Sequence, residues 1–95
     1  MSIEISHKET GNRGTFFIRK EKGIASELTY LMKGKNIMVI DHTETKPDFG
    51  GQGLGSMLVE KAVAYARQND YKIEPLCPFV EVKFDEHKEY SDVRA

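Results

Sequence analysis

The chain has 95 residues, of which 39% are apolar and 31% are charged, and its formal net charge is −1. A chain of this size has room for one modest core, so we expect a single domain over residues 1–95. Its balanced charges exclude a general affinity for nucleic acid or an anionic membrane, and no apolar stretch is long enough for a transmembrane helix.

The cysteine content and the chain ends bear on the cellular compartment in which the protein is expected. Cys77 is the one cysteine in the sequence, which excludes an internal disulfide. Residues 1–4 lack the basic start and apolar run of a secretory leader, Ser2 excludes N-myristoylation, and residues 93–95 form no prenylation signal. We therefore expect a protein of the reducing cytoplasm.

The first half of the chain is typical of β-structure. Alternating or β-branched runs predict strands at residues 3–8, 15–21, 24–33 and 36–45. A loop at residues 10–14 and short glycine turns at 22–23 and 34–35 join them, and such turns favour an antiparallel meander. Residues 37–40 are apolar on both faces, which places the fourth strand centrally in the sheet.

The second half predicts helices around one more strand. Residues 54–69 show helical spacing of apolar side chains, and residues 71–76 read as a crossover strand parallel to the fourth. Pro78 suits the first turn of a C-terminal helix, although Val80, Val82 and Phe84 also alternate as in a strand; we expect the helix. The predicted fold class is α+β, with a charged, frayed end at residues 86–95.

A glycine-rich segment joins the fourth strand to the long helix. It consists of Gly50, Gly51, Gln52, Gly53, Leu54 and Gly55. Glycines allow tight turns with several N–H groups aimed at one ligand, and the positive end of the helix dipole adds to them. The segment therefore predicts an anion site, most simply for phosphate.

Two familiar phosphate sites fit this loop poorly. A P-loop requires a lysine and a hydroxyl directly after the last glycine, and the chain offers Ser56 but no lysine before Lys61. A dinucleotide fingerprint is approached by Gly51, Gly53 and Ser56, with Glu74 as a ribose partner. That fingerprint belongs to a doubly wound fold built from βαβ units. The hairpin-linked strands and the short chain do not fit such a fold.

The loop resembles motif A of the GNAT superfamily of N-acetyltransferases, whose usual form is Val-x-Pro-x-x-(Arg or Gln)-Gly-x-Gly-x-(Gly or Ala). Pro47, Gly51, Gly53 and Gly55 match it, Thr45 stands at the valine position, and Gly50 replaces the arginine or glutamine. The resemblance implies a minimal GNAT-like fold: an antiparallel four-strand meander, glycine loop and long helix, parallel fifth strand and C-terminal helix.

Further residues are similar to a short single-domain GNAT subgroup with a Cys-Pro-Phe segment. They are the runs at residues 42–44, 75–80 and 87–90, with Lys88 where that subgroup usually has proline. The resemblance covers roughly residues 37–90. Compared with larger members, we expect the chain to lack the N-terminal helices that wall the acceptor pocket, the strand after the last helix, and an assignable tyrosine acid.

The resemblance implies binding of acetyl-coenzyme A and transfer of its acetyl group to an amine, either a small molecule or a protein. The implied binding residues are Thr43, Glu44, Thr45, Gly50, Gly51, Gln52, Gly53, Leu54, Gly55 and Ser56. In that arrangement backbone amides of the loop hold the pyrophosphate, and a splayed fourth strand offers unpaired backbone groups at residues 43–45 to the pantetheine arm.

Three side chains are candidates for catalysis. Cys77 would cap the helix that begins at Pro78, where the helix dipole favours a thiolate; it can accept the acetyl group, protonate the coenzyme thiol, or merely pack. His42 and Glu44 lie on one side of an alternating strand and can relay the proton of the amine, or simply face water. His7 is expected to be structural, and His87 to close the last helix.

The three histidines and one cysteine show no metal-ligand spacing, so we expect no metal site. The leading interpretation is an acetyl-coenzyme A-dependent N-acetyltransferase, monomeric or homodimeric. The alternatives are a non-catalytic acyl-coenzyme A binding or sensing module, and a nucleotide-binding or interaction module.

Overall fold

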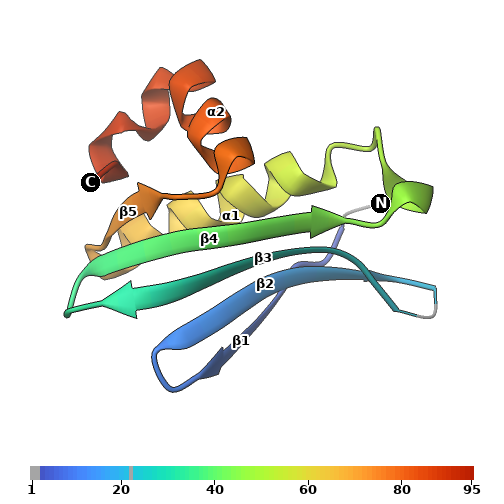
Figure 1. The fold of residues 1–95 in the computed structure, drawn as a ribbon, viewed down its shortest axis with the longest axis horizontal. Helices are drawn as coiled ribbons and strands as arrows, with labels where there is room; N and C mark the ends of the chain where they lie inside the picture. The colour runs from blue at the N-terminus through green and yellow to red at the C-terminus, as the bar shows by residue number, and fades with distance from the viewer. Residues whose placement is uncertain (1–2, 22) are drawn as a thin grey trace.

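A five-stranded sheet and a layer of helices make up the fold (Figure 1). The structure is a computed structural model that describes residues 3–21 and 23–95. The elements in chain order are β1 (Ser6–Thr10), β2 (Arg13–Lys20), β3 (Gly23–Lys33), β4 (Ile37–Thr45), the 3-10 helix η1 (Pro47–Phe49), α1 (Leu54–Asn69), β5 (Lys72–Pro75), α2 (Pro78–Glu86) and the 3-10 helix η2 (Lys88–Val93). No helix among the described residues has the length and apolarity to cross a membrane.

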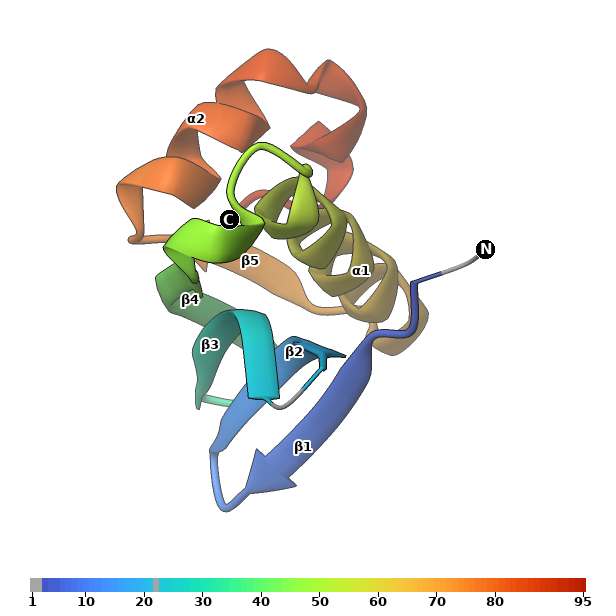
Figure 2. The same cartoon turned by 90° about the vertical axis from the view of Figure 1, so that its right-hand side faces the viewer.

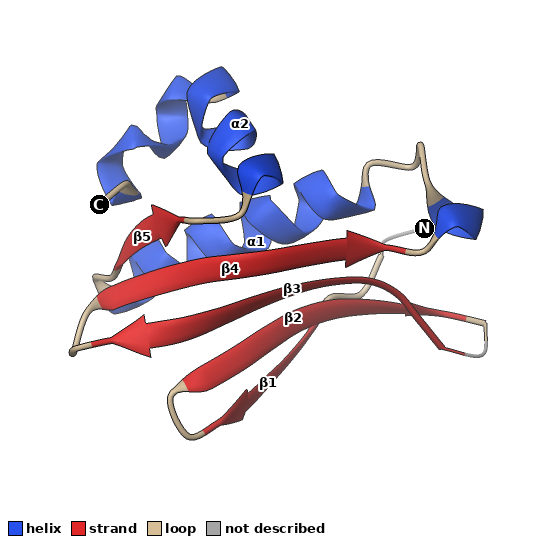
Figure 3. Ribbon diagram, viewed as in Figure 1, coloured by secondary structure: helices blue, strands red, loops and turns tan. Residues whose placement is uncertain are grey.

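The sheet has the order β1-β2-β3-β4-β5, with antiparallel pairs up to β4 and a parallel β4–β5 pair. This confirms the predicted α+β meander with a parallel fifth strand, and Figure 3 shows the helices collected beside the sheet. The first loop is shorter than expected, because Arg13 and Gly14 already pair in β2. Lys22 of the next turn lies outside the described residues, as do Met1 and Ser2, on which the expectation of no secretory leader and no myristoylation partly rests.

The core lies between one face of the sheet and α1. Viewed from the end, α1 runs across the concave side of the twisted sheet, with α2 beside it near β5 (Figure 2). The fully buried side chains of this layer include Phe16, Ile18, Leu28, Tyr30, Met38, Ile40, Leu54, Leu58, Val59 and Val63. Alternation in the strands and helical spacing in α1 place all of them on facing surfaces, as the sequence predicted.

The glycine at position 14 is required by packing rather than by a turn. A Cβ there would lie 2.3 Å from the Tyr30 ring, so only a glycine lets that ring lie flat on β2. The buried Tyr30 hydroxyl is 2.6 Å from Nε2 of His7, whose ring stacks on Phe16. This confirms the expected structural role of His7.

The end of the chain is ordered, so the predicted frayed tail is wrong. Tyr90 and Val93 are buried in the core, three residues apart as the η2 turn requires. The Asp92 carboxylate accepts two hydrogen bonds of 2.9 Å from Arg67 of α1. Two buried side chains within a charged segment are enough to fix it, although charged residues dominate the composition of this segment.

A β-bulge in β4 decides which way its polar end faces. Thr29 pairs with His42 and Tyr30 with Ile40, so Asp41 is the extra residue. Its carboxylate accepts hydrogen bonds from Thr29, at 2.7 Å, and Arg13, at 2.9 Å. Burial alone would raise the pKa of Asp41, but these bonds outweigh it and lower that pKa. As a result, the side chains of His42 and Glu44 lie on the face away from α1.

Candidate functional site

The strands β4 and β5 separate after Ile40 and form a fork. The Ile40 carbonyl accepts the N–H groups of both Leu76, at 3.0 Å, and Cys77, at 3.1 Å, and strand pairing ends there. Beyond it the chain turns into α2, while β4 continues to Thr45 with β3 as its ladder partner (Figure 1). The last residues of β4 therefore present a backbone edge towards the fork.

The alternating direction of backbone N–H and C=O groups along β4 identifies which of them lie on this edge. The Glu44 carbonyl accepts a hydrogen bond from Ser26, and the Lys46 N–H donates to Ala25, so both point towards β3. Successive residues of a strand point to opposite sides, which turns the N–H and C=O of Thr43 and Thr45 towards the fork. Of the three backbone positions expected to meet a ligand, Thr43 and Thr45 face the fork and the Glu44 carbonyl is engaged elsewhere.

The glycine loop connects η1, which follows β4, to the start of α1. The Gly50 N–H closes η1 on the Pro47 carbonyl at 3.2 Å. Gly51 and Gly53 have φ of 78° and 76°, a left-handed conformation that side chains disfavour. The loop thus depends on glycine at two of the positions that the motif specifies.

The start of α1 is suited to an anion. Gly53 is the N-cap and carries no side chain, and by helix geometry the N–H groups of Leu54, Gly55 and Ser56 have no intrahelical acceptor. The first turn of α1, which is described in full, holds no acidic side chain. Free donors and the helix dipole therefore converge at the loop, which Figure 2 shows at the near end of α1.

Apolar side chains border the fork on the α2 side. A Cβ on Gly55 would lie 3.0 Å from the Phe79 ring, so the glycine lets that ring lie against the first turn of α1. Leu76 and Phe79 are 60% and 39% exposed, so both side chains keep apolar surface open to solvent. They flank the buried Cys77 in the sequence and give the fork an apolar rim.

Cys77 caps α2 and contacts β4. It is the N-cap residue, as predicted, and its sulfur lies 3.3 Å from the Thr43 hydroxyl. Burial raises the pKa of the thiol, but the Thr43 hydroxyl and the backbone N–H groups of Val80, Phe79 and Thr43 outweigh it, so the pKa is lowered. The surroundings of this buried thiol therefore favour its thiolate form more than those of a free cysteine do.

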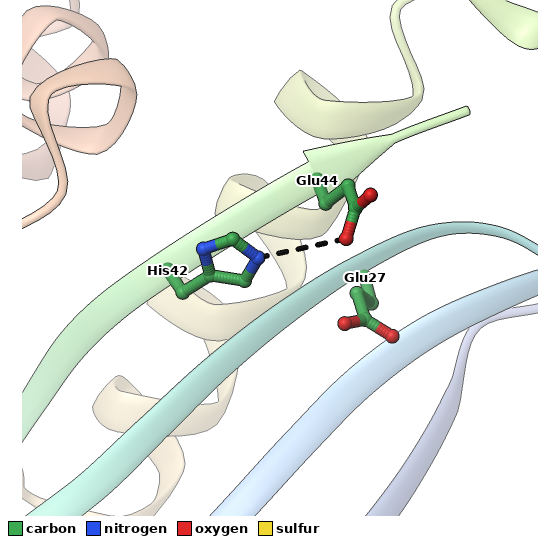
Figure 4. A group of neighbouring side chains, drawn as sticks. All are labelled: Glu27, His42 and Glu44. Carbon is green, nitrogen blue, oxygen red and sulfur yellow. Dashed lines mark ion pairs between the residues drawn. The ribbon is translucent and has the colours of Figure 1, made fainter. Parts of the chain in front are cut away.

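On the other face of β4, His42 and Glu44 form a cluster with Glu27 of β3 (Figure 4). The imidazole Nε2 is 3.7 Å from a Glu44 carboxylate oxygen, and one ligand atom from each of the three groups lies within 4.8 Å of the others. The sequence expectation of no metal site rested on dispersed histidines; the fold gathers one histidine and two carboxylates, a set that a divalent cation can use.

Glu27 was missed because nothing local marks it. It is one of two charged residues in β3, the other being Lys33, and it meets Glu44 only through the register that the Asp41 bulge sets. The three candidates for catalysis are also divided: Cys77 lies with Thr43 on one face of β4, while His42 and Glu44 lie on the other. The sequence placed them together, but the β4 backbone lies between them.

A family model described as GCN5-related N-acetyl-transferase matches residues 15–93. A solved structure of a GCN5-like candidate N-acetyltransferase from Staphylococcus aureus is 33% identical, with 98% of this chain and 88% of that chain covered and a TM-score of 0.76. The search of curated proteins gave no significant match.

More distant structures share the fold. A ribosomal-protein-alanine N-acetyltransferase from Brucella melitensis biovar Abortus 2308 is 17% identical, with 88% of this chain and 64% of that chain covered and a TM-score of 0.63. An aminoglycoside acetyltransferase from an uncultured soil metagenomic sample is 14% identical, with 85% and 58% covered and a TM-score of 0.65. The chain spans under two thirds of these two proteins. Given the family match over residues 15–93 and the fold around the fork, the chain belongs to the GCN5-related N-acetyltransferase family.

Proposed function

We propose that this protein binds acetyl-coenzyme A and transfers the acetyl group to an amine. The observation that carries the proposal is the continuity of β4: the strand that opens the fork after Ile40 runs directly into the glycine loop at the start of α1. An extended ligand with a diphosphate at the loop can thus lay its acyl end in the fork. Family membership supports the same assignment.

The residues present fit such a ligand. The N–H groups of Gly51, Gln52, Gly53, Leu54, Gly55 and Ser56 would hold the diphosphate, whereas the Gly50 N–H already donates to the Pro47 carbonyl. The backbone groups of Thr43 and Thr45 would bond the amide-bearing arm as a further strand does. A hollow of about 160 Å³ between α1 and α2 reaches the first turn of α1, and its polar lining consists of Ser56, Glu60, Lys83, His87 and Tyr90.

Acetyl-coenzyme A, when bound, supplies a thioester: the amine nitrogen forms the C–N bond, the C–S bond breaks, one amine proton leaves, and the thiolate gains a proton. His42 and Glu44 would accept the amine proton on the open face of β4. Backbone N–H groups at the fork would stabilise charge on the carbonyl oxygen. Cys77 would protonate the departing thiolate, or accept the acetyl group itself in a two-step route.

A second candidate function is a non-catalytic acyl-coenzyme A binding or sensing module. It is favoured by Gly50, which offers no side chain to the diphosphate, and by the exposure of the His42 and Glu44 side chains, 54% and 60%. An exposed base has an ordinary aqueous environment, so it gains little catalytic advantage from the fold.

Titration with coenzyme A, followed by backbone amide shifts, tests donor binding. We expect the largest shifts at Gly51–Gly55 and Thr43, and undisturbed loop amides at saturation would overturn both functions. Incubating the protein with acetyl-coenzyme A and amines then separates them. Loss of the thioester signal with at least one amine marks an enzyme, whereas binding without turnover of any amine marks the sensing module.

Intact-mass spectrometry of the same mixture examines Cys77. An acetyl adduct on the wild type that is absent from Cys77→Ala supports the two-step route. Full turnover by Cys77→Ala would remove this residue from the mechanism, and His42→Ala and Glu44→Gln test the proton relay in the same assay.

A further inference from the structure

A hollow of about 340 Å³ opens beside the polar end of β4. Four charged side chains line it, Arg19 of β2, Glu27 of β3, and Glu44 and Lys46 at the end of β4, and the first residues of β3 complete it. Ligand pockets span roughly 300–1,000 Å³, so this one suits a small molecule. It shares Glu27 and Glu44 with the His42 cluster, on the face of β4 away from α1.

Two of these charges repel each other. Glu27 and Glu44 are directly opposite in the β3–β4 register, and like charges at such positions destabilise a sheet. The imidazole of His42, 3.7 Å from Glu44, offers a positive charge only when it is protonated. A pair of facing carboxylates is therefore placed where a cation bound between them would relieve the repulsion.

The two basic side chains of the hollow do not neutralise this pair. Among the described residues, no ion pair within 4.0 Å joins Arg19 or Lys46 to Glu27, Glu44 or any other carboxylate. The Arg19 guanidinium instead lies over the Phe17 ring, 5.3 Å from its centre. Charges of both signs thus line one small hollow and stay apart, an arrangement complementary to a ligand that carries both charges itself.

We infer that this hollow is the acceptor site and that the acceptor is a small amine bearing an anionic group, such as an amino acid. The ammonium lies between Glu27 and Glu44, and the carboxylate or phosphate lies at Arg19 and Lys46, where a guanidinium can bind two oxygens at once. This inference rests on the proposed acetyl transfer for its chemistry. Binding of the acceptor to the hollow can nevertheless be measured without acetyl transfer.

The first experiment titrates the wild-type protein, without coenzyme A, with β-alanine, γ-aminobutyrate, propylamine and propionate. We expect the amino acids to shift the backbone amides of Arg19, Glu27, Glu44 and Lys46 with a dissociation constant at least about tenfold lower than either singly charged analogue, a difference of about 1.4 kcal/mol. Equal binding of propylamine, equal binding of propionate, or no shift with any of the four overturns the inference, whatever the protein does with coenzyme A.

The second experiment uses Arg19→Ala/Lys46→Ala, with Lys35→Ala in the β3–β4 turn as the matched control. We expect the ratio of kcat/KM for β-alanine over propylamine to fall about tenfold in the double variant and to stay unchanged in the control. An unchanged ratio in the double variant, with its amide spectrum still folded, overturns the inference. If coenzyme A binds and propylamine is acetylated as well as β-alanine, the inference fails while the proposed function stands.

Discussion

The Thr43 hydroxyl lies 3.3 Å from the Cys77 sulfur and links β4 to the start of α2 across the fork. This contact joins two elements that are 34 residues apart in the chain, and it places the thiol at the point where the proposed acetyl donor would end. It is also one of the bonds that lower the pKa of the thiol.

Replacing Thr43 with valine removes that hydroxyl and keeps its shape. We expect the pKa of Cys77 to rise and its alkylation by iodoacetamide at neutral pH to slow about two- to tenfold, in line with one lost hydrogen bond of about 0.5–1.5 kcal/mol. Thr45→Val is the control, since the Thr45 hydroxyl contacts Ser26 instead. Equal slowing in both variants would show that the contact with Thr43 does not set the reactivity.

The glycine loop can be tested by comparing two alanine substitutions with similar strain. Gly51 and Gly34 have φ of 78° and 67°, and a Cβ on either meets no atom within 4 Å. Each alanine costs about 1–2 kcal/mol of left-handed strain. We expect only Gly51→Ala to weaken coenzyme A binding, about fivefold or more by calorimetry, because Gly34 lies in the β3–β4 turn. Equal affinities would argue against diphosphate binding at the loop.

Gly14→Ala is expected to destabilise the fold. The added methyl would lie 2.3 Å from the Tyr30 ring, and overpacking of this kind costs about 1–3 kcal/mol. Gly23→Ala is a suitable control, because its Cβ meets no atom within 4 Å. Urea denaturation gives the free energy of unfolding of both variants. A denaturation midpoint of Gly14→Ala equal to that of the wild type would contradict the close contact between position 14 and the Tyr30 ring.

The stability of the protein should depend on His7 below neutral pH. Burial lowers the pKa of His7 in the folded state from an ordinary value of 6.5, so the fold favours the neutral ring. The unfolded chain then takes up the proton first, and stability that is complete above pH 6.5 is lost as the pH falls towards the folded pKa. We expect the free energy of unfolding to fall between pH 7 and 5 in the wild type. The fall should be smaller in His7→Gln; equal slopes would exclude His7 as its source.

The end of the chain should contribute to stability. Tyr90 is 8% exposed, and its ring centre lies 5.5 Å from that of Phe84 of α2, with the two rings tilted by 56°. Truncation of a buried aromatic costs about 3–5 kcal/mol, so Tyr90→Ala is expected to lower the denaturation midpoint strongly. Ser91→Ala, an exposed change in the same turn, should leave it in place. A small effect of Tyr90→Ala would mean that η2 detaches without loss of the core.

Local patterns were enough to predict the fold and the loop. The glycines at positions 51 and 53 stand where the backbone is left-handed, and Pro78 correctly places Cys77 at the cap of α2. These features depend on residues adjacent in sequence, which is why the sequence predicts them.

Long-range register could not be predicted in the same way. No residue around Asp41 marks it as the bulged position, since its partners Arg13 and Thr29 come from other strands. The pairing of Glu27 with Glu44 and the division between Cys77 and His42 both follow from that register. Gly14 was taken for a loop residue because the ring that excludes a side chain there is sixteen residues further along, at Tyr30.

Asp41 also acts as a phase shift in the side-chain pattern of β4. Side chains of a strand alternate with period two, so deleting this one residue would exchange the orientation of every position from 42 to 45. The two hydroxyls would then turn outward, and an imidazole and a carboxylate would be driven into the apolar layer beneath α1. A variant lacking Asp41 would keep nearly the same composition, but the side chains of residues 42–45 would change faces. It should not retain both the packed core and the fork.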